Sequence, residues 1–415
     1  MFSLPYGHGQ LTFHLPDGLP IEVVEPAKVA AAADPLDAVA VALDVMVGDV
    51  TWENWRGARS AAIAINDETR PVPHEYLLPP LLRRLEGLGL APGAIQLLIA
   101  TGTHPPLPRS GYARIVPAGI LARHPVLGHD PEDPANLVLL GTTLRGTPIW
   151  INRHFLAADL RIVVGNVEPH QFQGFSGGVK SAAIGLAGRE TIHHNHSLMT
   201  DPRAQVGRYA DNPARQDVEE IGRAIGVHLA VNAVLNGQKQ IVHIIAGEPE
   251  AVMEVAIPLS RQINQVPVAA PFDLVIASPG GHPKDLNLYQ AQKALAHASL
   301  VTRDGGSLIL AAACPAGTGS ERYERWMAGM SSHRQVIERF EKEGFSIGAH
   351  KAYQIARDAV RLRVWLVSSL DPGQVRSFLL EPAAGLDEAV AQVLPTLPSD
   401  ARVGIMPQAS STIPG

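Results

Sequence analysis

Short apolar runs alternate with amphipathic or alanine-rich stretches along this chain, and that alternation limits its fold more than any other feature. It is the pattern of an α/β protein, in which helices cover a mostly parallel sheet. The expected strands of a first series are Ser60 to Ile65, Ile95 to Ala100, Leu137 to Leu140, Leu160 to Gly165, Val227 to Leu235 and Ile241 to Ala246. The expected helices of that series are His74 to Glu86, Gly188 to His196, Pro213 to Ile225 and Glu248 to Gln265.

A second series begins after Gln265 to Phe272, a segment with two prolines that we expect to be a linker. Its expected strands are Leu274 to Ala277, Ser307 to Ala312 and Val364 to Ser368. Its expected helices are Leu288 to His297, Arg322 to Met330, Arg334 to Glu343 and Gly385 to Val393. A chain of 415 residues exceeds the usual size of one core, so the sequence predicts two α/β domains, over 1–268 and 269–398. The terminal strand Val403 to Ile405, in the tail 399–415, is a candidate to return to the first domain.

Composition and charge exclude several classes of protein. Hydrophobic residues make up 46% of the chain and charged residues 18%, which suits large buried cores rather than disorder. A net charge of -6 gives no electrostatic footprint for nucleic acid. Charged residues interrupt the apolar stretch Ala27 to Val47, and Met1 to Gln10 lacks a basic start and an apolar run, so we expect neither a membrane span nor a signal peptide.

The single cysteine, Cys314, excludes an internal disulfide and a Cys-rich zinc site. It ends an apolar run, so we expect a small buried filler rather than a nucleophile. A cytoplasmic protein is the simple inference. Any metal chemistry must then depend on histidine, carboxylate or donors that a cofactor brings.

Reactive side chains follow four of the expected strands. These side chains are Asp67, Arg70, His104, His170, Tyr289, Gln290 and Lys293. In open α/β sheets, ligands collect beyond the carboxyl ends of the strands. Polar residues at four such ends therefore predict a functional site, although any one of them alone would be a weak signal.

The segment Gly174 to Ser181 resembles a nucleotide-binding P-loop but departs from it at one position. The GxxxxGK[ST] pattern requires glycine where Val179 stands, because the backbone curls tightly there to present its amides. The glycines can form a nest for a different phosphate, or simply a tight turn before a helix. Lys180 is either a surface or phosphate-neutralising lysine or a covalent anchor made reactive by partial burial.

Three further signals each have a functional and a structural interpretation. His104 ends a turn after a strand, where it is a candidate general base or a turn-stabilising hydrogen-bond partner. Arg70 is suited to a substrate carboxylate, or to an ion pair with Asp67. The cluster His193, His194 and His196 is either a set of helix residues or a source of metal ligands, and it lacks the HExxH pattern of zincins. Together these parts suggest an enzyme with a phosphate-bearing, metallated cofactor.

The same residues closely resemble the nickel-dependent lactate racemase family and its 2-hydroxy-acid racemase and epimerase relatives. The resemblance runs in family order through Asp67 to Arg70, Thr101 to His104, Glu168 to His170, Ser176 to Lys180, Glu190 to His196 and Tyr289 to Lys293. It implies two α/β domains with the active site in the cleft between them. It also implies a nickel-pincer nucleotide (nickel pyridinium-3,5-bisthiocarboxylic acid mononucleotide) attached covalently through Lys180. The sulfur ligands would then arrive with the cofactor.

The resemblance also assigns a role to each matching position. His196 corresponds to the nickel ligand, and His104 and His170 to the two proton-transferring histidines. Cofactor-binding positions are Lys180, Asp67, Ser176, Gly177, Gly178 and Lys293, and substrate-binding positions are Arg70, Tyr289, Gln290 and Lys293. In the family, Asp67 matches a loop acid that helps position the arginine or the cofactor. The reaction implied is inversion at C2 of a small 2-hydroxy acid by proton-coupled hydride transfer.

The sequence departs from the family pattern in places. Pro105 stands where an arginine is common, His193-His194 is an unusual doublet, and the run Ala183 to Gly185 lacks the usual proline. A substitution beside His104 predicts a 2-hydroxy acid other than lactate. Enzymes that synthesise the cofactor are expected partners, and a homo-oligomer is left open. The alternatives are a P-loop-like phosphotransferase and a non-catalytic homologue that binds the cofactor without turnover.

Overall fold

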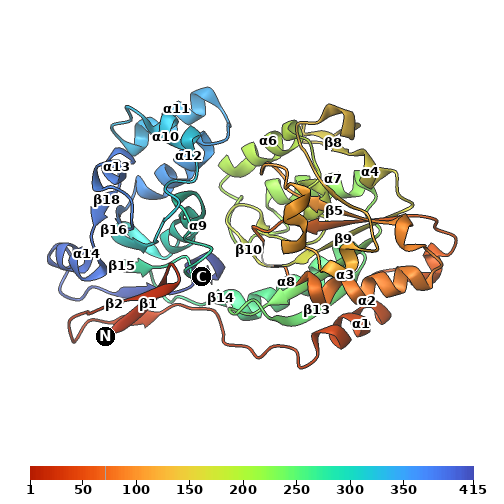
Figure 1. The fold of residues 1–415 in the computed structure, drawn as a ribbon. Helices are drawn as coiled ribbons and strands as arrows, with labels where there is room; N and C mark the ends of the chain where they lie inside the picture. The colour runs from red at the N-terminus through yellow and green to blue at the C-terminus, as the bar shows by residue number, and fades with distance from the viewer. Residues whose placement is uncertain (71) are drawn as a thin grey trace. The chain divides into compact units, whose positions relative to one another are not determined.

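The computed structural model describes residues 1–70 and 72–415 and divides into two compact units. The central unit spans Lys28–Ile263, and the terminal unit combines Met1–Ala27 with Asn264–Gly415. In Figure 1 the central unit runs from orange to green, and the terminal unit combines the red strands with the teal and blue elements. Each unit is an α/β structure built on a six-stranded sheet, so the predicted fold class is confirmed.

The sheet of the central unit has the strand order β13-β12-β9-β4-β5-β6. All neighbours are parallel except β13, which is antiparallel to β12. The strands are β4 (Ala61–Asn66), β5 (Ile95–Ala100), β6 (Val126–Gly128), β9 (Leu160–Asn166), β12 (Leu229–Leu235) and β13 (Ile241–Gly247). Most of their residues are buried, as expected for parallel strands whose two faces are covered by helices.

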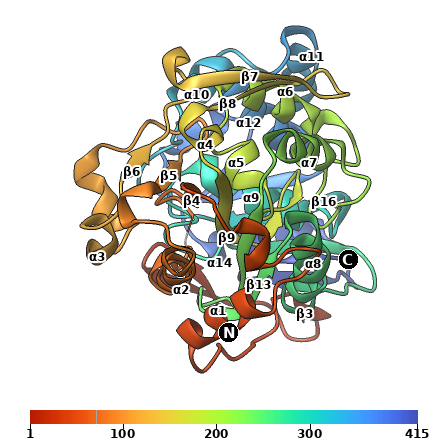
Figure 2. The ribbon, with the colours of Figure 1, turned by 90° about the vertical axis from the view of Figure 1, so that its right-hand side faces the viewer.

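The helices of the central unit are α1 (Pro35–Asp44), α2 (His74–Gly87), α3 (Ala118–Leu121), α4 (Arg153–Leu156), α5 (Lys180–Ala183), α6 (Arg189–Ser197), α7 (Pro213–Ile225) and α8 (Pro249–Asn264). Outside the main sheet, β7 (Leu137–Thr142) forms a hairpin with β8 (Pro148–Asn152), and β10 (Pro169–His170) forms one with β11 (Gly174–Phe175). The predicted strand at Leu137 to Leu140 therefore lies in a hairpin rather than in the main sheet. Figure 2 shows this hairpin beside α6.

Helix α7 shows how local sequence sets the boundaries that the site depends on. The Asn212 side chain accepts a hydrogen bond from the Arg215 amide and caps the helix, while Pro213 fills its first turn. Gly226 ends the helix with φ +69°, a conformation that costs glycine little. These signals explain why the predicted helix Pro213 to Ile225 and the observed one coincide.

The sheet of the terminal unit has the order β18-β17-β16-β15-β19-β3, and all neighbours are parallel. Its strands are β3 (Ile21–Val23), β15 (Phe272–Ala277), β16 (Thr302–Ala311), β17 (Arg363–Val367), β18 (Glu381–Ala383) and β19 (Val403–Met406). Its helices are α9 (Leu288–Ser299), α10 (Glu321–Met327), α11 (His333–Glu343), α12 (Ala349–Ala359), α13 (Pro372–Ser377) and α14 (Leu386–Val393). The short pairs β1 (Phe2–Tyr6) with β2 (Gly9–Phe13) and β14 (Gln265–Val266) with β20 (Ile413–Pro414) complete it.

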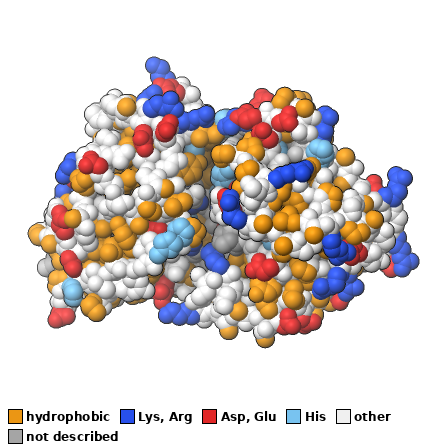
Figure 3. Space-filling view, in the orientation of Figure 1, with side chains coloured by type: hydrophobic (Ala, Val, Ile, Leu, Met, Phe, Trp, Pro, Cys, Tyr) orange, Lys and Arg blue, Asp and Glu red, His pale blue; other side chains and the backbone are white. Residues whose placement is uncertain are grey.

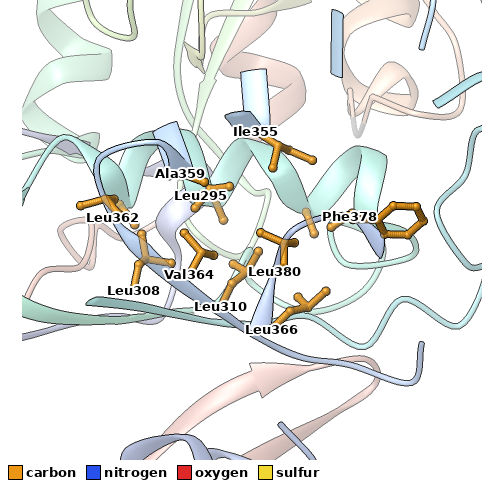
Figure 4. Packing of buried hydrophobic residues seen from close by; sticks show 14 of the residues in the cluster. Leu295, Leu308, Leu310, Ile355, Ala359, Leu362, Val364, Leu366, Phe378 and Leu380 are labelled. Atoms are coloured by element: carbon orange, nitrogen blue, oxygen red, sulfur yellow. The ribbon is translucent and has the colours of Figure 1, made fainter. Parts of the chain in front are cut away.

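One face of the terminal sheet carries a large apolar core. Leu295 of α9 and Ile355 of α12 pack with Leu308 and Leu310 of β16 and with Leu366 of β17 (Figure 4). Each of these side chains is almost fully buried. Burying a leucine or isoleucine contributes about 1.5–3 kcal/mol, so this layer is a large part of what holds α9 and α12 on the sheet.

Both ends of the chain belong to the terminal unit, which differs from the predicted division at residue 268. Strand β19 does not return to the first domain, because it pairs with β15 on one side and β3 on the other. The first 27 residues supply β3 to the same sheet. Such long-range pairing leaves no local sequence signal, since a three-residue strand carries too little pattern to identify its partner.

Among the described residues, 1–70 and 72–415, no helix is long and apolar enough to span a bilayer. Figure 3 shows lysine and arginine side chains interspersed with aspartate and glutamate over the visible face.

Candidate active site

Three predicted site residues of the central unit follow three neighbouring parallel strands. Asp67 follows β4, His104 follows β5 and His170 follows β9, in a sheet ordered β9-β4-β5. Because these strands are parallel, their carboxyl ends lie at one edge of the sheet. This is the edge at which α/β proteins bind ligands.

His104 is bonded to a buried carboxylate. Its Nδ1 lies 2.6 Å from Oδ2 of Asp67, whose residue is 7% exposed. Because a carboxylate oxygen accepts, Nδ1 of His104 carries the hydrogen, and in the neutral ring Nε2 then holds the lone pair. The turn that presents the ring is closed by Gly102, with φ +57°, and by a bond from the His104 amide to the Thr101 carbonyl. His104 can therefore accept a proton at Nε2.

The other carboxylate oxygen of Asp67 is also occupied. Oδ1 accepts from the Thr69 amide at 3.1 Å and from the Thr69 hydroxyl at 2.7 Å. Burial opposes ionisation, but the hydrogen bond from His104, the His104 charge, the Thr69 hydroxyl and the nearby Arg70 outweigh it and lower the pKa of Asp67. The sequence interpretations paired this acid with Arg70 or the cofactor and did not identify its bond to His104.

His170 is bonded in the opposite sense. It lies in β10 opposite Gly174, and the Gln173 amide donates to its Nδ1 at 3.2 Å. An imidazole nitrogen that accepts an N–H carries no hydrogen, so the proton of the neutral His170 ring is on Nε2. Gly174 makes this hairpin possible, because a Cβ there would lie 1.6 Å from the Arg208 carbonyl oxygen.

The structure brings His170 and the predicted metal ligand His196 together. Phe172, which is buried, contacts both rings edge-on, with centroid distances of 4.9 Å to His170 and 5.0 Å to His196. His196 lies on α6, and its Nδ1 is 3.2 Å from Oδ1 of Asn195. The two imidazoles therefore belong to one aromatic cluster.

Lys180 begins α5 at the end of the glycine-rich loop. The preceding residue, Val179, packs so closely against Gly222 of α7 that a Cβ on that glycine would lie 2.5 Å from it. Arg215, also on α7 and fully buried, donates to the carbonyl oxygens of Phe175 and Gly177, both at 3.1 Å. Helix α7 thus fixes the loop that places Lys180.

Several amides of this loop are bonded within the protein. The Ser176 amide donates to the Glu168 carbonyl, the Gly178 amide to Oδ1 of Asn232 at 2.6 Å, and the Lys180 amide to the Gly177 carbonyl. A P-loop instead directs its amides at phosphates. This arrangement disfavours the phosphotransferase interpretation. Phosphate binding by Ser176, Gly177 and Gly178 stays a prediction.

Helix α5 is tied to the same edge of the sheet as the histidines. The Ser181 hydroxyl donates to Oδ1 of Asn66, the last residue of β4, at 3.3 Å. The Gly102 amide, in the turn of His104, donates to the Gly185 carbonyl just after α5. The lysine and the two strand-end histidines thus share one region of the central unit.

The remaining predicted residues, Tyr289, Gln290 and Lys293, begin α9 of the terminal unit. Lys293 donates from Nζ to Oε1 of Gln290 at 2.6 Å, and the Tyr289 hydroxyl lies 3.2 Å from Nε2 of His350. A buried lysine of α12, Lys351, lies 4.5 Å above the Tyr289 ring. Their assignment to a substrate pocket stays a prediction.

Helix α12 was not among the predicted elements, so the sequence interpretation missed His350 and Lys351. Its buried face mixes His350, Lys351, Gln354 and Asp358 with alanines, which hides the apolar period that identifies a helix.

Two expectations about metal and thiol chemistry can be compared with the structure. Among residues 1–70 and 72–415, no group of three or more His, Cys, Asp or Glu side chains could hold a metal ion. A metal site built from His193, His194 and His196 together is therefore absent there. Cys314 is 1% exposed, and burial, together with Asp285, raises the pKa of its thiol to about 12, as expected for a filler.

The chain matches two family models, the lactate racemase N-terminal domain over residues 6–207 and the lactate racemase C-terminal domain over residues 268–413. It is 32% identical to a lactate racemase of Lactiplantibacillus plantarum, over 91% of this chain and 90% of that protein. It is 29% identical to a lactate racemase of Thermoanaerobacterium thermosaccharolyticum, over 99% of this chain and 98% of that one.

Solved structures give the same picture. The lactate racemase apoprotein from Thermoanaerobacterium thermosaccharolyticum superposes with a TM-score of 0.94 at 29% identity, covering 100% of this chain and 99% of that one. A protein from Thermotoga maritima superposes with a TM-score of 0.67 at 19% identity, covering 93% of this chain and 100% of that one, which shows a shared fold alone.

Proposed function

This chain belongs to the lactate racemase family and is an isomerase, and we propose that it inverts the C2 centre of a 2-hydroxy acid by proton-coupled hydride transfer. The observation that carries the proposal is the pair of imidazoles that follow β5 and β9, the strands on either side of β4, with opposite partners at Nδ1. Inversion requires one group to take the hydroxyl proton of one enantiomer and another to return a proton to the second enantiomer's oxygen.

The residues of this chain fit a nickel-pincer nucleotide as cofactor. His196 offers an imidazole, a donor suited to nickel, beside the aromatic cluster of His170, and the half-buried Lys180 offers an amine for a covalent bond. The protein's lone cysteine is buried, so the soft sulfur donors would come with the group itself. When bound, that cofactor supplies the hydride acceptor and donor for C2.

His104 takes the hydroxyl proton of one enantiomer at Nε2, while Asp67 holds the Nδ1 hydrogen and stabilises the imidazolium that forms. Arg70 binds the substrate carboxylate through its planar guanidinium. As the hydroxyl proton leaves, the C2 hydrogen leaves with its electron pair, which gives a planar 2-keto acid. The hydrogen then returns to the other face with its electron pair, and the oxygen receives a proton from the imidazolium form of His170, which becomes the neutral ring. The hydrogen and electron pair that leave C2 are returned to it, so substrate and product are at the same oxidation level, and one proton is taken for each one given.

The structure favours this over the two alternatives. A phosphotransferase would need the loop amides that Glu168, Asn232 and Gly177 already occupy. A non-catalytic homologue would not need two histidines with opposite proton positions at the sheet edge to which the helix of Lys180 is bonded.

A panel of single enantiomers of 2-hydroxy acids, lactate included, tests the proposal. The protein should be produced in a host that makes the cofactor, and the products should be analysed by chiral chromatography. We expect interconversion of at least one pair of enantiomers, about one nickel per chain and a mass adduct that K180R abolishes. Pro105 predicts that lactate is not the best substrate. A nickel-loaded, Lys180-modified protein that converts no 2-hydroxy acid would refute the proposal.

A further inference from the structure

We propose that Asn195, held by Asp217, is a positioning residue that fixes the proton of His196 on Nδ1 and its lone pair on Nε2. The inference rests on the proposed function, in which His196 is the protein's nickel ligand. A neutral imidazole can bind a metal through either nitrogen, so the nitrogen that keeps the proton decides which one can coordinate.

The orientation of the Asn195 amide is fixed by its partners. Asn195 is fully buried, and its Nδ2 donates to the Ala214 carbonyl and to Oδ2 of Asp217, both at 2.9 Å. Both partners only accept, so both amide hydrogens are used and Oδ1 must be the acceptor. Gln173 agrees, because its Nε2 donates to that same Oδ1 at 2.9 Å.

This orientation determines the state of His196. Its Nδ1 lies 3.2 Å from Oδ1 of Asn195, an oxygen that can only accept. The hydrogen of the neutral ring is therefore on Nδ1, and Nε2 holds the lone pair. Metal-binding histidines commonly donate their other N–H to an oxygen in this way, which fixes the tautomer and the ring orientation.

Asp217 anchors the arrangement from α7. Its side chain is fully buried and accepts from the hydroxyls of Thr143 at 2.6 Å and Thr147 at 2.9 Å, in addition to Asn195. Since the Thr147 hydroxyl gives its hydrogen to Asp217, Nδ1 of His194 must donate to Thr147, at 2.8 Å. His194 is thus bonded to the scaffold, which separates its role from that of His196.

The inference predicts the imidazole state of His196 in the protein without cofactor. In ¹⁵N-histidine-labelled apoprotein at mildly alkaline pH, two-bond ¹H–¹⁵N correlation spectra distinguish protonated from unprotonated ring nitrogens, and H196Q identifies the signal. We expect the Nδ1–H form in the wild type and a mixture in N195A. In D217N one of the partners that fix the Asn195 amide is replaced by an amide that can also donate, so the orientation of Asn195 is less strictly set and part of the Nε2–H form should become populated.

Thr143→Val is the matched control, because it removes a bond from Asp217 without touching Asn195. It should leave the His196 spectrum unchanged. In the loaded enzyme, N195A should lose roughly 10- to 100-fold in nickel retention against a chelator, and T143V should retain nickel like the wild type.

Two results would overturn the inference: an Nε2–H form of His196 in the wild type, or an N195A protein that keeps both the Nδ1–H form and its nickel. If N195A fails to fold, D217N carries the same test. A wild-type protein with Nδ1–H on His196 that binds no nickel in a competent host would contradict the proposed function instead.

Discussion

The turn that carries His104 and the hairpin that carries His170 are built in opposite ways. In the turn, Nδ1 of the imidazole faces a carboxylate, which only accepts; in the hairpin, Nδ1 faces the Gln173 amide, which only donates. The first arrangement is compatible with both the neutral ring and the imidazolium. The second is compatible with the neutral ring alone, because an imidazolium would place its Nδ1 hydrogen against another N–H.

The difference teaches that two identical side chains, which follow the strands on either side of β4, are bonded so that they hold their protons at different nitrogens. His104 can gain a proton without any change in its partner. His170 can begin as a proton-carrying imidazolium only if the turn at 171–173 gives up the Gln173 bond. We infer that proton uptake by His104 uses the arrangement described here, and that proton donation by His170 requires a local shift of the hairpin.

The largest expected effect is the loss of either imidazole. His104→Ala and His170→Ala should each lower kcat/KM by roughly 100- to 10,000-fold, the usual contribution of a positioned acid or base. Because two enantiomers are equal in free energy, kcat/KM should fall equally in both directions. Chiral assays from each enantiomer, with the exposed His154→Ala as control, measure this. A variant that keeps wild-type kcat/KM would remove its histidine from the mechanism.

A substitution in α7 tests what holds the hairpin that carries His170. Arg215 is fully buried, donates to the carbonyls of Phe175 and Gly177, and pairs with the buried Glu219 at 2.6 Å. Arg215→Met leaves Glu219 as an uncompensated buried charge, so we expect a loss of about 3–5 kcal/mol in the free energy of unfolding. Chemical denaturation measures this loss.

Two controls separate the loss of the Arg215–Glu219 ion pair from the loss of the bonds that Arg215 makes to the loop at 175–177. The double variant R215M/E219L removes both charges and should recover part of the stability, because no charge is left buried alone. Hydrogen exchange should become faster at the loop amides of 174–178 in both variants, and not at 101–104. Equal protection of both segments would show that Arg215 does not hold the hairpin.

Local signals in the sequence were sufficient to predict several helices and strands and the sheet edge at which three of the site residues lie. Helix α7 was predicted to the residue because Asn212, Pro213 and Gly226 mark its ends, and the strand-end rule placed Asp67, His104 and His170 at one edge of a sheet. The partners of these residues were not predictable. Gln173, which donates to His170, belongs to no motif, and neither do Asn195 and Asp217, which lie beside His196. The bonds that join Gln173, Asn195, Asp217 and Thr143 connect residues 22 to 74 positions apart, and their geometry depends on the packing of α6 against α7.

A third histidine, His74, tests whether the hydrogen-bond partner at Nδ1 or burial decides if an imidazole is protonated. His74 also faces an acceptor at Nδ1, the Ile115 carbonyl at 3.2 Å, but it is 3% exposed, and burial, opposed by this bond, lowers its pKa from 6.5 to about 4. The folded state therefore resists protonation of His74. The contribution of the neutral ring to the free energy of unfolding is fully present above pH 6.5 and is lost as the pH falls toward 4. The shift corresponds to about 3 kcal/mol. Urea unfolding across this window should show a shallower pH dependence for His74→Gln, and an unchanged slope would contradict the assignment.

Asp67→Asn is the smallest change, and it should give His104 the proton position that His170 has. The Thr69 amide and hydroxyl both donate to Oδ1, so the new carbonyl oxygen should stay there and the new amide should face Nδ1 of His104. His104 would then hold its lone pair on Nδ1 and its proton on Nε2, as His170 does. The turn should keep its geometry, yet kcat/KM should fall at least about tenfold, since the ring could no longer accept a proton at Nε2.

Two-bond ¹H–¹⁵N spectra of His104 should show the reversed tautomer. Full activity with a reversed tautomer would mean that His104 is not the base, whereas an unreversed tautomer would mean that Asp67 does not set it.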